Sequence, residues 1–265
     1  MAVAAFFDLD KTILAKSSTL AVSRPFFDGG LINRRSVLRS AYAQFMFALQ
    51  GADHDHMERM RIYLSSMVVG WPVQTVREIV AETLHTIVDP LVYEEAVDLI
   101  EAHQAQGHDV VIVSASGADV VGPIGEMLGA NHVIATEMVV RNGLYTGEIG
   151  TYAYGEGKAS AMRGLAQARG YDMSDCYAYS DSETDVPMLT SVGYPHAVNP
   201  DKVLRRMAAD QAWPVLEFRR PVELKEHARW GSSRSRAGAM AAAAGAVGAG
   251  FVSWQLRRVR HRVVG

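Results

Sequence analysis

Cysteine is almost absent from this chain of 265 residues, since Cys176 is the only one. A single cysteine cannot form a disulfide within the chain, which is typical of a reducing compartment. No pair of cysteines or histidines has the spacing of a zinc site. An excess of basic charge is also missing, because the net charge is −3. The composition therefore excludes a disulfide framework and indicates no nucleic-acid partner.

We expect no signal peptide at the N-terminus. The apolar run at residues 2–7 is short, has no basic residue before it and is followed at once by Asp8. A secretory signal has basic residues followed by a longer apolar stretch. We therefore expect the folded part of the chain to stay in the cytoplasm.

Long uncharged runs are absent except near the C-terminus. Residues 237–256 carry no charge and, as a helix, would span about 30 Å, the thickness of a hydrocarbon core. Twelve of these twenty residues are Ala or Gly, so they favour insertion only weakly. Two hypotheses remain open for the basic segment 219–265. Either its Ala/Gly-rich helix attaches the chain to the inner face of the cell membrane, or the tail is disordered or packs on protein.

Short apolar runs alternate with helical patterns over most of the chain. The runs predict buried strands at residues 2–7, 108–113, 132–136 and 176–179. The helical patterns lie at residues 92–106, 118–128 and 158–169, the last closed by Gly170. This alternation predicts an α/β fold with a doubly wound parallel sheet. Asn142-Gly143 predicts a two-residue hairpin turn.

Residues 18–91 interrupt the alternation. Apolar residues recur there at helical spacing, in 36–49, 57–69 and 73–87. The segment lies between the first strand and its expected partner. We interpret it as a helical cap inserted into a core that is formed by residues 1–17 and 92–218.

Asp8 and Asp10 follow the first predicted strand, in the sequence Asp8-Leu9-Asp10-Lys11-Thr12. Two carboxylates this close are costly to hold without a cation, and Mg²⁺ would remove that cost. Asp8 can attack phosphorus as a nucleophile, while Asp10 can protonate the leaving alcohol and then activate water. Thr12 can donate hydrogen bonds to anionic oxygens. An acidic turn without chemistry is the alternative for this pentapeptide alone.

Further polar groups follow the other predicted strands. Ser114 ends the second strand before a helix, where backbone N–H groups can approach a phosphate. Lys158 opens a helix and can neutralise phosphoryl charge. Asp181 can complete a metal site, and Asp185 can support that site without binding the metal itself. Singly, the serine is more often a plain helix cap, the lysine is usually solvated, and the acidic cluster is also typical of the start of a helix. Together, at the carboxyl ends of parallel strands, they predict a phosphoryl-transfer site.

These motifs resemble those of the haloacid dehalogenase superfamily, specifically the branch that contains phosphoserine phosphatase. The resemblance covers residues 2–218. Residues 8–12 resemble the first motif, Ser114 the second, Lys158 the third, and residues 180–185 the fourth. The resemblance implies a Rossmann-like core with a helical cap.

The resemblance also implies a role for each matching residue. Mg²⁺ would be held by the Asp8 carboxylate, the Asp10 backbone carbonyl and the Asp181 carboxylate. Ser114 and Lys158 would hold the phosphoryl oxygens. Asp185 would anchor the waters around the metal.

The chain departs from that branch where the substrate is recognised. Ser17 stands where phosphoserine phosphatases have a glutamate that meets the substrate amino group, and their Ser-Gly-Gly motif is replaced by Ser114-Ala115-Ser116. We therefore expect a small phosphorylated metabolite other than phosphoserine. Arg59 or Arg61 in the cap can meet an anionic group of the substrate, although a solvated helix face is the alternative.

The sequence thus predicts a Mg²⁺-dependent phosphomonoester hydrolase that works through a phospho-aspartate on Asp8. Two other hypotheses remain open. One is a non-catalytic regulatory or membrane-scaffold protein that binds a phosphorylated ligand. The other is a phosphotransferase that passes the phosphoryl group to a second alcohol.

Overall fold

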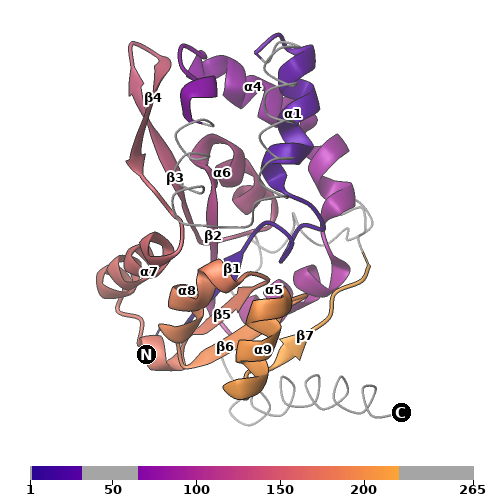
Figure 1. Cartoon of the computed structure of the whole chain (residues 1–265), viewed down its shortest axis with the longest axis vertical. Helices are drawn as coiled ribbons and strands as arrows, with labels where there is room; N and C mark the ends of the chain where they lie inside the picture. Colours follow the sequence, from indigo (N-terminus) through magenta and orange to yellow (C-terminus); the bar gives the residue numbers. More distant parts are fainter. Residues whose placement is uncertain (1, 32–64, 221–265) are drawn as a thin grey trace, which may run out of the picture.

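The computed structural model describes residues 2–31 and 65–220 (Figure 1). Within these two ranges, no helix is long and apolar enough to cross a membrane. Several predictions lie outside the described residues: the helix at 36–49, most of the helix at 57–69, Arg59, Arg61, and the tail at 221–265. Membrane attachment through residues 237–256 therefore stays a prediction.

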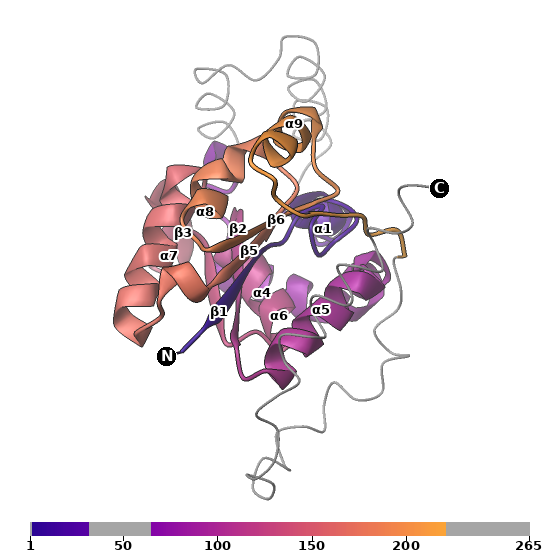
Figure 2. The same ribbon diagram turned by 90° about the horizontal axis from the view of Figure 1, so that it is seen from below.

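A seven-stranded sheet forms the centre of the fold, in the order β4-β3-β2-β1-β5-β6-β7. Its strands are β1 (Ala4–Asp8), β2 (Asp109–Gly117), β3 (His132–Arg141), β4 (Leu144–Thr151), β5 (Tyr177–Ser180), β6 (Tyr194–Val198) and β7 (Val215–Leu216). Neighbouring strands are parallel except in the antiparallel pair β3–β4. Helices lie on both sides of the sheet (Figure 2), so the predicted doubly wound α/β fold is confirmed.

The described helices are α1 (Ser18–Asp28), α4 (Val73–Thr83), α5 (Glu94–Ala105), α6 (Ala118–Met127), α7 (Glu156–Arg169), α8 (Val186–Thr190) and α9 (Lys202–Asp210). Alternate residues of β1 face opposite layers. Phe7 packs in a hydrophobic cluster with residues of α5 and α6, whereas Phe6 packs in a second cluster with residues of α7, α8 and α9. Because both faces are covered, every residue of β1 is buried, as the continuous apolar run requires.

The local signals in the sequence predicted several details correctly. Asn142 and Gly143 both have positive φ, 52° and 75°, and join β3 to β4 as the expected hairpin. Gly170 closes α7 in the left-handed conformation. The sequence patterns did not predict the last part of the sheet, β6 and β7, or the helices α8 and α9.

The described part of the insert packs beside the core at the end of the sheet where β1 finishes (Figure 1). Helix α4 packs against α1 and α6. Its first residue, Val73, donates a backbone hydrogen bond of 3.0 Å to Gly143 at the hairpin tip. The predicted helix at 73–87 ends as an α-helix at Thr83 and continues as a π-helical turn, Leu84–Val88. The division into core and cap domains stays a prediction.

A buried cluster of histidine and tyrosine lies between α5 and strands β5 and β6. His103 Nε2 hydrogen-bonds the Tyr179 hydroxyl at 2.8 Å, and its Nδ1 meets His108 Nδ1 at 2.9 Å. His196 stacks on Tyr179 from β6. Burial lowers the pKa of His103 to about 3 and that of His196 to about 4. Both rings are therefore neutral in the folded protein at pH 7.

This cluster predicts acid sensitivity. A histidine with a lowered folded pKa binds fewer protons folded than unfolded, so its contribution to stability is present above its ordinary pKa of about 6.5 and is lost as pH falls below that value. Between about pH 7.5 and 5.5, the wild type should lose about 1 kcal/mol more than His103→Gln, which does not titrate. Urea unfolding of both proteins at the two pH values measures this difference. Equal losses of unfolding free energy in the two proteins would contradict the lowered pKa of His103.

Candidate active site

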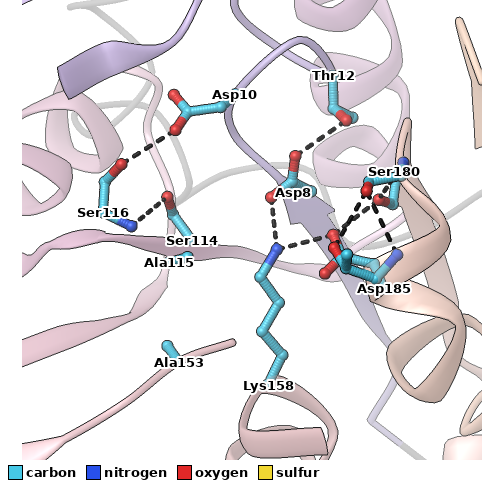
Figure 3. Close-up of polar contacts among 12 residues, drawn as sticks. Asp8, Asp10, Thr12, Ser114, Ala115, Ser116, Ala153, Lys158, Ser180 and Asp185 are labelled. Carbon is cyan, nitrogen blue, oxygen red and sulfur yellow. Dashed lines mark hydrogen bonds and ion pairs between the residues drawn. The ribbon is translucent and has the colours of Figure 1, made fainter. Parts of the chain in front are cut away.

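Three strand ends meet at one edge of the sheet. Strand β1 lies between β2 and β5, and the register pairs Asp8 with Val113 on β2. Consequently Asp8, Ser114 and Ser180, the polar residues that end or follow the three apolar runs, lie close together (Figure 3). This is the crevice at the carboxyl ends of the strands where open α/β sheets bind ligands.

Asp8 is buried and both of its carboxylate oxygens are engaged. Lys158 Nζ donates to Oδ1 at 2.6 Å, and the Thr12 hydroxyl donates to Oδ2 at 3.1 Å. Thr12 reaches back because the chain turns tightly after β1, with Lys11 at a positive φ of 63° and Ile13 N–H bonded to the Leu9 carbonyl. The first predicted motif is therefore a compact loop around its own first carboxylate.

Lys158 enters the site from the first turn of α7. Its Nζ lies 2.6 Å from Asp8 Oδ1 and 2.7 Å from Asp185 Oδ2, and its side chain is 4% exposed. The preceding Gly157 allows this placement, because a Cβ there would lie 2.2 Å from the Tyr152 carbonyl oxygen. The close approach of α7 to the end of β4 thus aims the lysine at the end of β1 (Figure 3).

Asp185 is held from two sides. Its Oδ2 accepts hydrogen bonds from Lys158 Nζ and from the Ser180 hydroxyl, each 2.7 Å long. No donor among the described residues reaches its Oδ1, although that atom is buried. Because an unpaired buried carboxylate oxygen is costly, this atom indicates room for a further partner such as water.

The site carries more buried negative charge than positive. Asp8, Asp181 and Asp185 are all less than 10% exposed, and Lys158 is the cation buried among them. Three carboxylates and one ammonium give a formal charge of −2. Burial raises the pKa of Asp8 to about 8, although Lys158 lowers it, and burial raises the pKa of Asp181 to about 6.

A divalent cation would offset this excess charge. It would favour the ionised forms of Asp8 and Asp181, whose pKa values burial now raises. The described residues hold no cluster of three or more acidic, histidine or cysteine side chains of the kind that cages a metal. The donor set that the family resemblance implies is not such a cluster, because it consists of two carboxylates and the Asp10 backbone carbonyl. Such oxygen donors suit Mg²⁺, which retains several waters.

Asp10 lies in a different environment from Asp8. It is partly exposed, its Oδ1 accepts the Ser18 backbone N–H at 2.6 Å, and its Oδ2 accepts the Ser116 hydroxyl at 3.0 Å. Ser114 is buried, and its hydroxyl accepts the Ser116 backbone N–H at 3.2 Å. The hydroxyl groups of Ser114 and Thr12 therefore lie on opposite sides of the Asp8–Asp10 loop (Figure 3).

The structure brings together Asp8, Thr12, Lys158 and Asp185 by direct contacts, and places Ser114, Asp10 and Asp181 around them. No role was predicted for Ser18 and Ser116, which hydrogen-bond Asp10. Ser116 belongs to the Ser-Ala-Ser sequence near the end of β2, so its residue type gave a signal. Its partner could not be inferred from local sequence.

The fold and this arrangement define a hydrolase of the haloacid dehalogenase-like class. The family model for haloacid dehalogenase-like hydrolases matches residues 5–190, more than half of the chain. The chain belongs to this family. The predicted resemblance is therefore confirmed.

Curated relatives cover nearly the whole chain. It is 61% identical to the "Inhibition of morphological differentiation protein" of Streptomyces azureus, over 98% of this chain and 95% of the relative. It is 58% identical to a protein of Mycobacterium tuberculosis named as a probable phosphatase, over 96% of this chain and 89% of the relative. The prediction of an enzyme of the phosphatase type is confirmed at this level.

A solved structure described as a phospho-aspartyl intermediate analogue of phosphoserine phosphatase has the same fold. The TM-score is 0.58 at 18% sequence identity, with 86% of this chain and 98% of that chain covered. Its similarity supports the architecture of the core.

Replacing Lys158 tests the buried ion pair. Lys158→Met leaves the carboxylates without their counter-charge, and breaking a buried pair in this way costs about 3–5 kcal/mol. The surface pair of Arg141 with Glu148, whose side chains are 68% and 60% exposed, provides the control. Arg141→Met should change stability by less than about 1 kcal/mol. Urea unfolding in the presence of a chelator measures both, and equal small losses would contradict the buried pair.

Proposed function

We propose that this protein is a Mg²⁺-dependent phosphomonoester hydrolase that forms a phospho-aspartate on Asp8. The observation that supports it best is the buried Asp8 carboxylate at the end of β1, within 2.6 Å of the Lys158 ammonium. A carboxylate can attack a phosphate only if the repulsion between the two anions is offset. Lys158 and a bound cation supply that compensating charge.

The reaction proceeds in two displacements. In the first, an Asp8 carboxylate oxygen bonds to phosphorus, the bond from phosphorus to the alcohol oxygen breaks, and Asp10 gives its proton to that oxygen. In the second, Asp10 takes a proton from water, whose oxygen attacks phosphorus. The bond from phosphorus to the Asp8 oxygen breaks in this step, which releases inorganic phosphate and regenerates the Asp8 carboxylate.

The other residues hold the phosphoryl group during both steps. Lys158 neutralises charge on its oxygens, and the hydroxyl groups of Thr12 and Ser114 donate hydrogen bonds to them. Asp8, Asp181 and the Asp10 carbonyl would hold Mg²⁺, which supplies positive charge to the phosphoryl oxygens. Asp185 orients Lys158 through the 2.7 Å contact, and its Oδ1, which no donor of the described residues reaches, would accept a hydrogen bond from water around the metal.

The substrate is a small phosphorylated metabolite other than phosphoserine. Ser17 occupies the N-cap of α1, one residue before Ser18, whose backbone N–H meets Asp10. A neutral side chain there provides no carboxylate for a substrate amino group. Recognition of the alcohol therefore depends on residues other than Ser17.

Replacing Asp8 tests the covalent step. Asp8→Asn keeps the shape of the side chain but lacks a nucleophilic oxygen anion, so release of phosphate from p-nitrophenyl phosphate should fall by at least about 10³-fold. The hydroxylamine-sensitive phosphoenzyme trapped from the wild type should also disappear. Asp210→Asn, an exposed change at the end of α9, is the control and should keep full activity. Substantial turnover by Asp8→Asn would exclude this mechanism, and a wild type without Mg²⁺-dependent phosphate release would favour the binding-only hypothesis.

Removal of Asp181 tests the metal site without measuring turnover. Mg²⁺ that binds only the folded protein should raise the unfolding free energy of the wild type by about 2.7 kcal/mol at a concentration about 100 times its dissociation constant. Asp181→Asn should lose most of this gain at the same concentration, whereas Asp210→Asn should retain it. Urea unfolding with and without Mg²⁺ measures the effect. An unchanged gain in Asp181→Asn would remove Asp181 from the metal site.

A further inference from the structure

Ser116 lies at the meeting point of the core, Asp10 and the insert. Its hydroxyl donates to Asp10 Oδ2 at 3.0 Å, accepts from the Ser18 hydroxyl at 3.0 Å and lies 3.2 Å from the Thr19 hydroxyl. Ser18 and Thr19 form the first turn of α1. The Ser116 hydroxyl thus contacts both Asp10, the candidate acid, and α1, the helix that follows Asp10 in the chain.

The backbone of β2 places Ser116 there. Pairing with β3 is regular up to Ser114 and resumes at Gly117, so the two residues between them bulge out of the register. The Ser116 N–H bonds back to the Ser114 hydroxyl at 3.2 Å, and Thr136 bonds the Ala115 carbonyl at 2.7 Å. A bulge of this kind re-aims a side chain at the end of a strand. Here it turns Ser116 toward Asp10 (Figure 3).

Asp10 needs such partners to hold one orientation. The carboxylate of aspartate rotates in a broad, two-fold well, and Asp10 lies on a partly exposed loop. The Ser18 N–H fixes Oδ1, and the Ser116 hydroxyl fixes Oδ2. Two donors from different elements define the plane of the carboxylate, which a single donor does not.

We propose that Ser116 is a positioning residue that aims the Asp10 carboxyl at the leaving oxygen of the substrate. This inference rests on the proposed function above. As the bond from phosphorus to the leaving oxygen breaks, that oxygen takes the proton of Asp10, and the distance between the two oxygens decides how readily it moves. A hydroxyl suits this task because it can donate to the carboxylate and accept from the carboxylic acid. Without it, the Ser18 N–H alone holds Asp10, so the carboxyl group faces the leaving oxygen for a smaller fraction of the time and protonates it less readily.

The dependence on the leaving group separates this role from a structural one. Phenolate needs a proton as it leaves much more than p-nitrophenolate does, whereas the two phosphate esters are otherwise alike. In Ser116→Ala, kcat/KM should fall about ten-fold for phenyl phosphate and about two-fold or less for p-nitrophenyl phosphate. Because kcat/KM covers only the steps up to release of the alcohol, the later activation of water does not enter. Ser116→Thr keeps the hydroxyl and should bring the ratio of the kcat/KM values for the two esters most of the way back to that of the wild type.

Ser191→Ala is the matched control. It removes a half-buried hydroxyl that donates to the Met188 carbonyl at 2.7 Å on α8, and should leave the ratio of the two kcat/KM values unchanged. Urea unfolding checks that both variants are folded. Equal losses for the two esters in Ser116→Ala, or no rescue by threonine, would overturn the positioning role. If instead the proposed function is wrong, Asp8→Asn will retain full activity, which distinguishes that failure from a failure of the positioning role.

Discussion

The contact of Lys158 with Asp8 and Asp185 is the interaction on which the site depends. It joins α7 to the end of β1 and to the loop after β5, with N···O distances of 2.6 and 2.7 Å. One buried ammonium cannot neutralise three buried carboxylates, so the arrangement is held by packing around it. The fully buried β1 and the glycine at position 157 supply that packing. The site thus has a local excess of negative charge, which favours binding of a cation.

The sequence predicted the parts of this site that follow from strand ends. Asp8, Ser114 and Asp181 each follow a short apolar run, and the carboxyl ends of parallel strands meet at one edge of a sheet. The hairpin at Asn142-Gly143 could also be predicted from local sequence, because few other residues adopt positive φ at two successive positions. In both cases a few neighbouring residues determine the structure.

Features that depend on distant partners could not be predicted in the same way. Strand β7 has only two residues, and β6 contains Pro195, so neither shows a clear strand pattern. The pairing of His103 with Tyr179 joins residues 76 positions apart. Helix α9 did have a local signal, since Asp201 caps it by accepting the N–H groups of Val203 and Leu204. The bulge that aims Ser116 at Asp10 arises from the pairing of β2 with β3.

Asp8 and Asp10 show how two carboxylates in one loop acquire different chemistry. Asp8 is buried against a lysine, whereas Asp10 is partly exposed and accepts hydrogen bonds from neutral donors of Ser18 and Ser116. The described hydrogen-bond partners of Asp8 come from the β1 loop and from α7. Asp10 depends also on α1, whose first N–H group and hydroxyl contact it directly or through Ser116. A shift of α1 would consequently disturb the contacts of Asp10 while the Asp8–Lys158 pair stays in place, and in the proposed mechanism it would slow proton transfer to the leaving group.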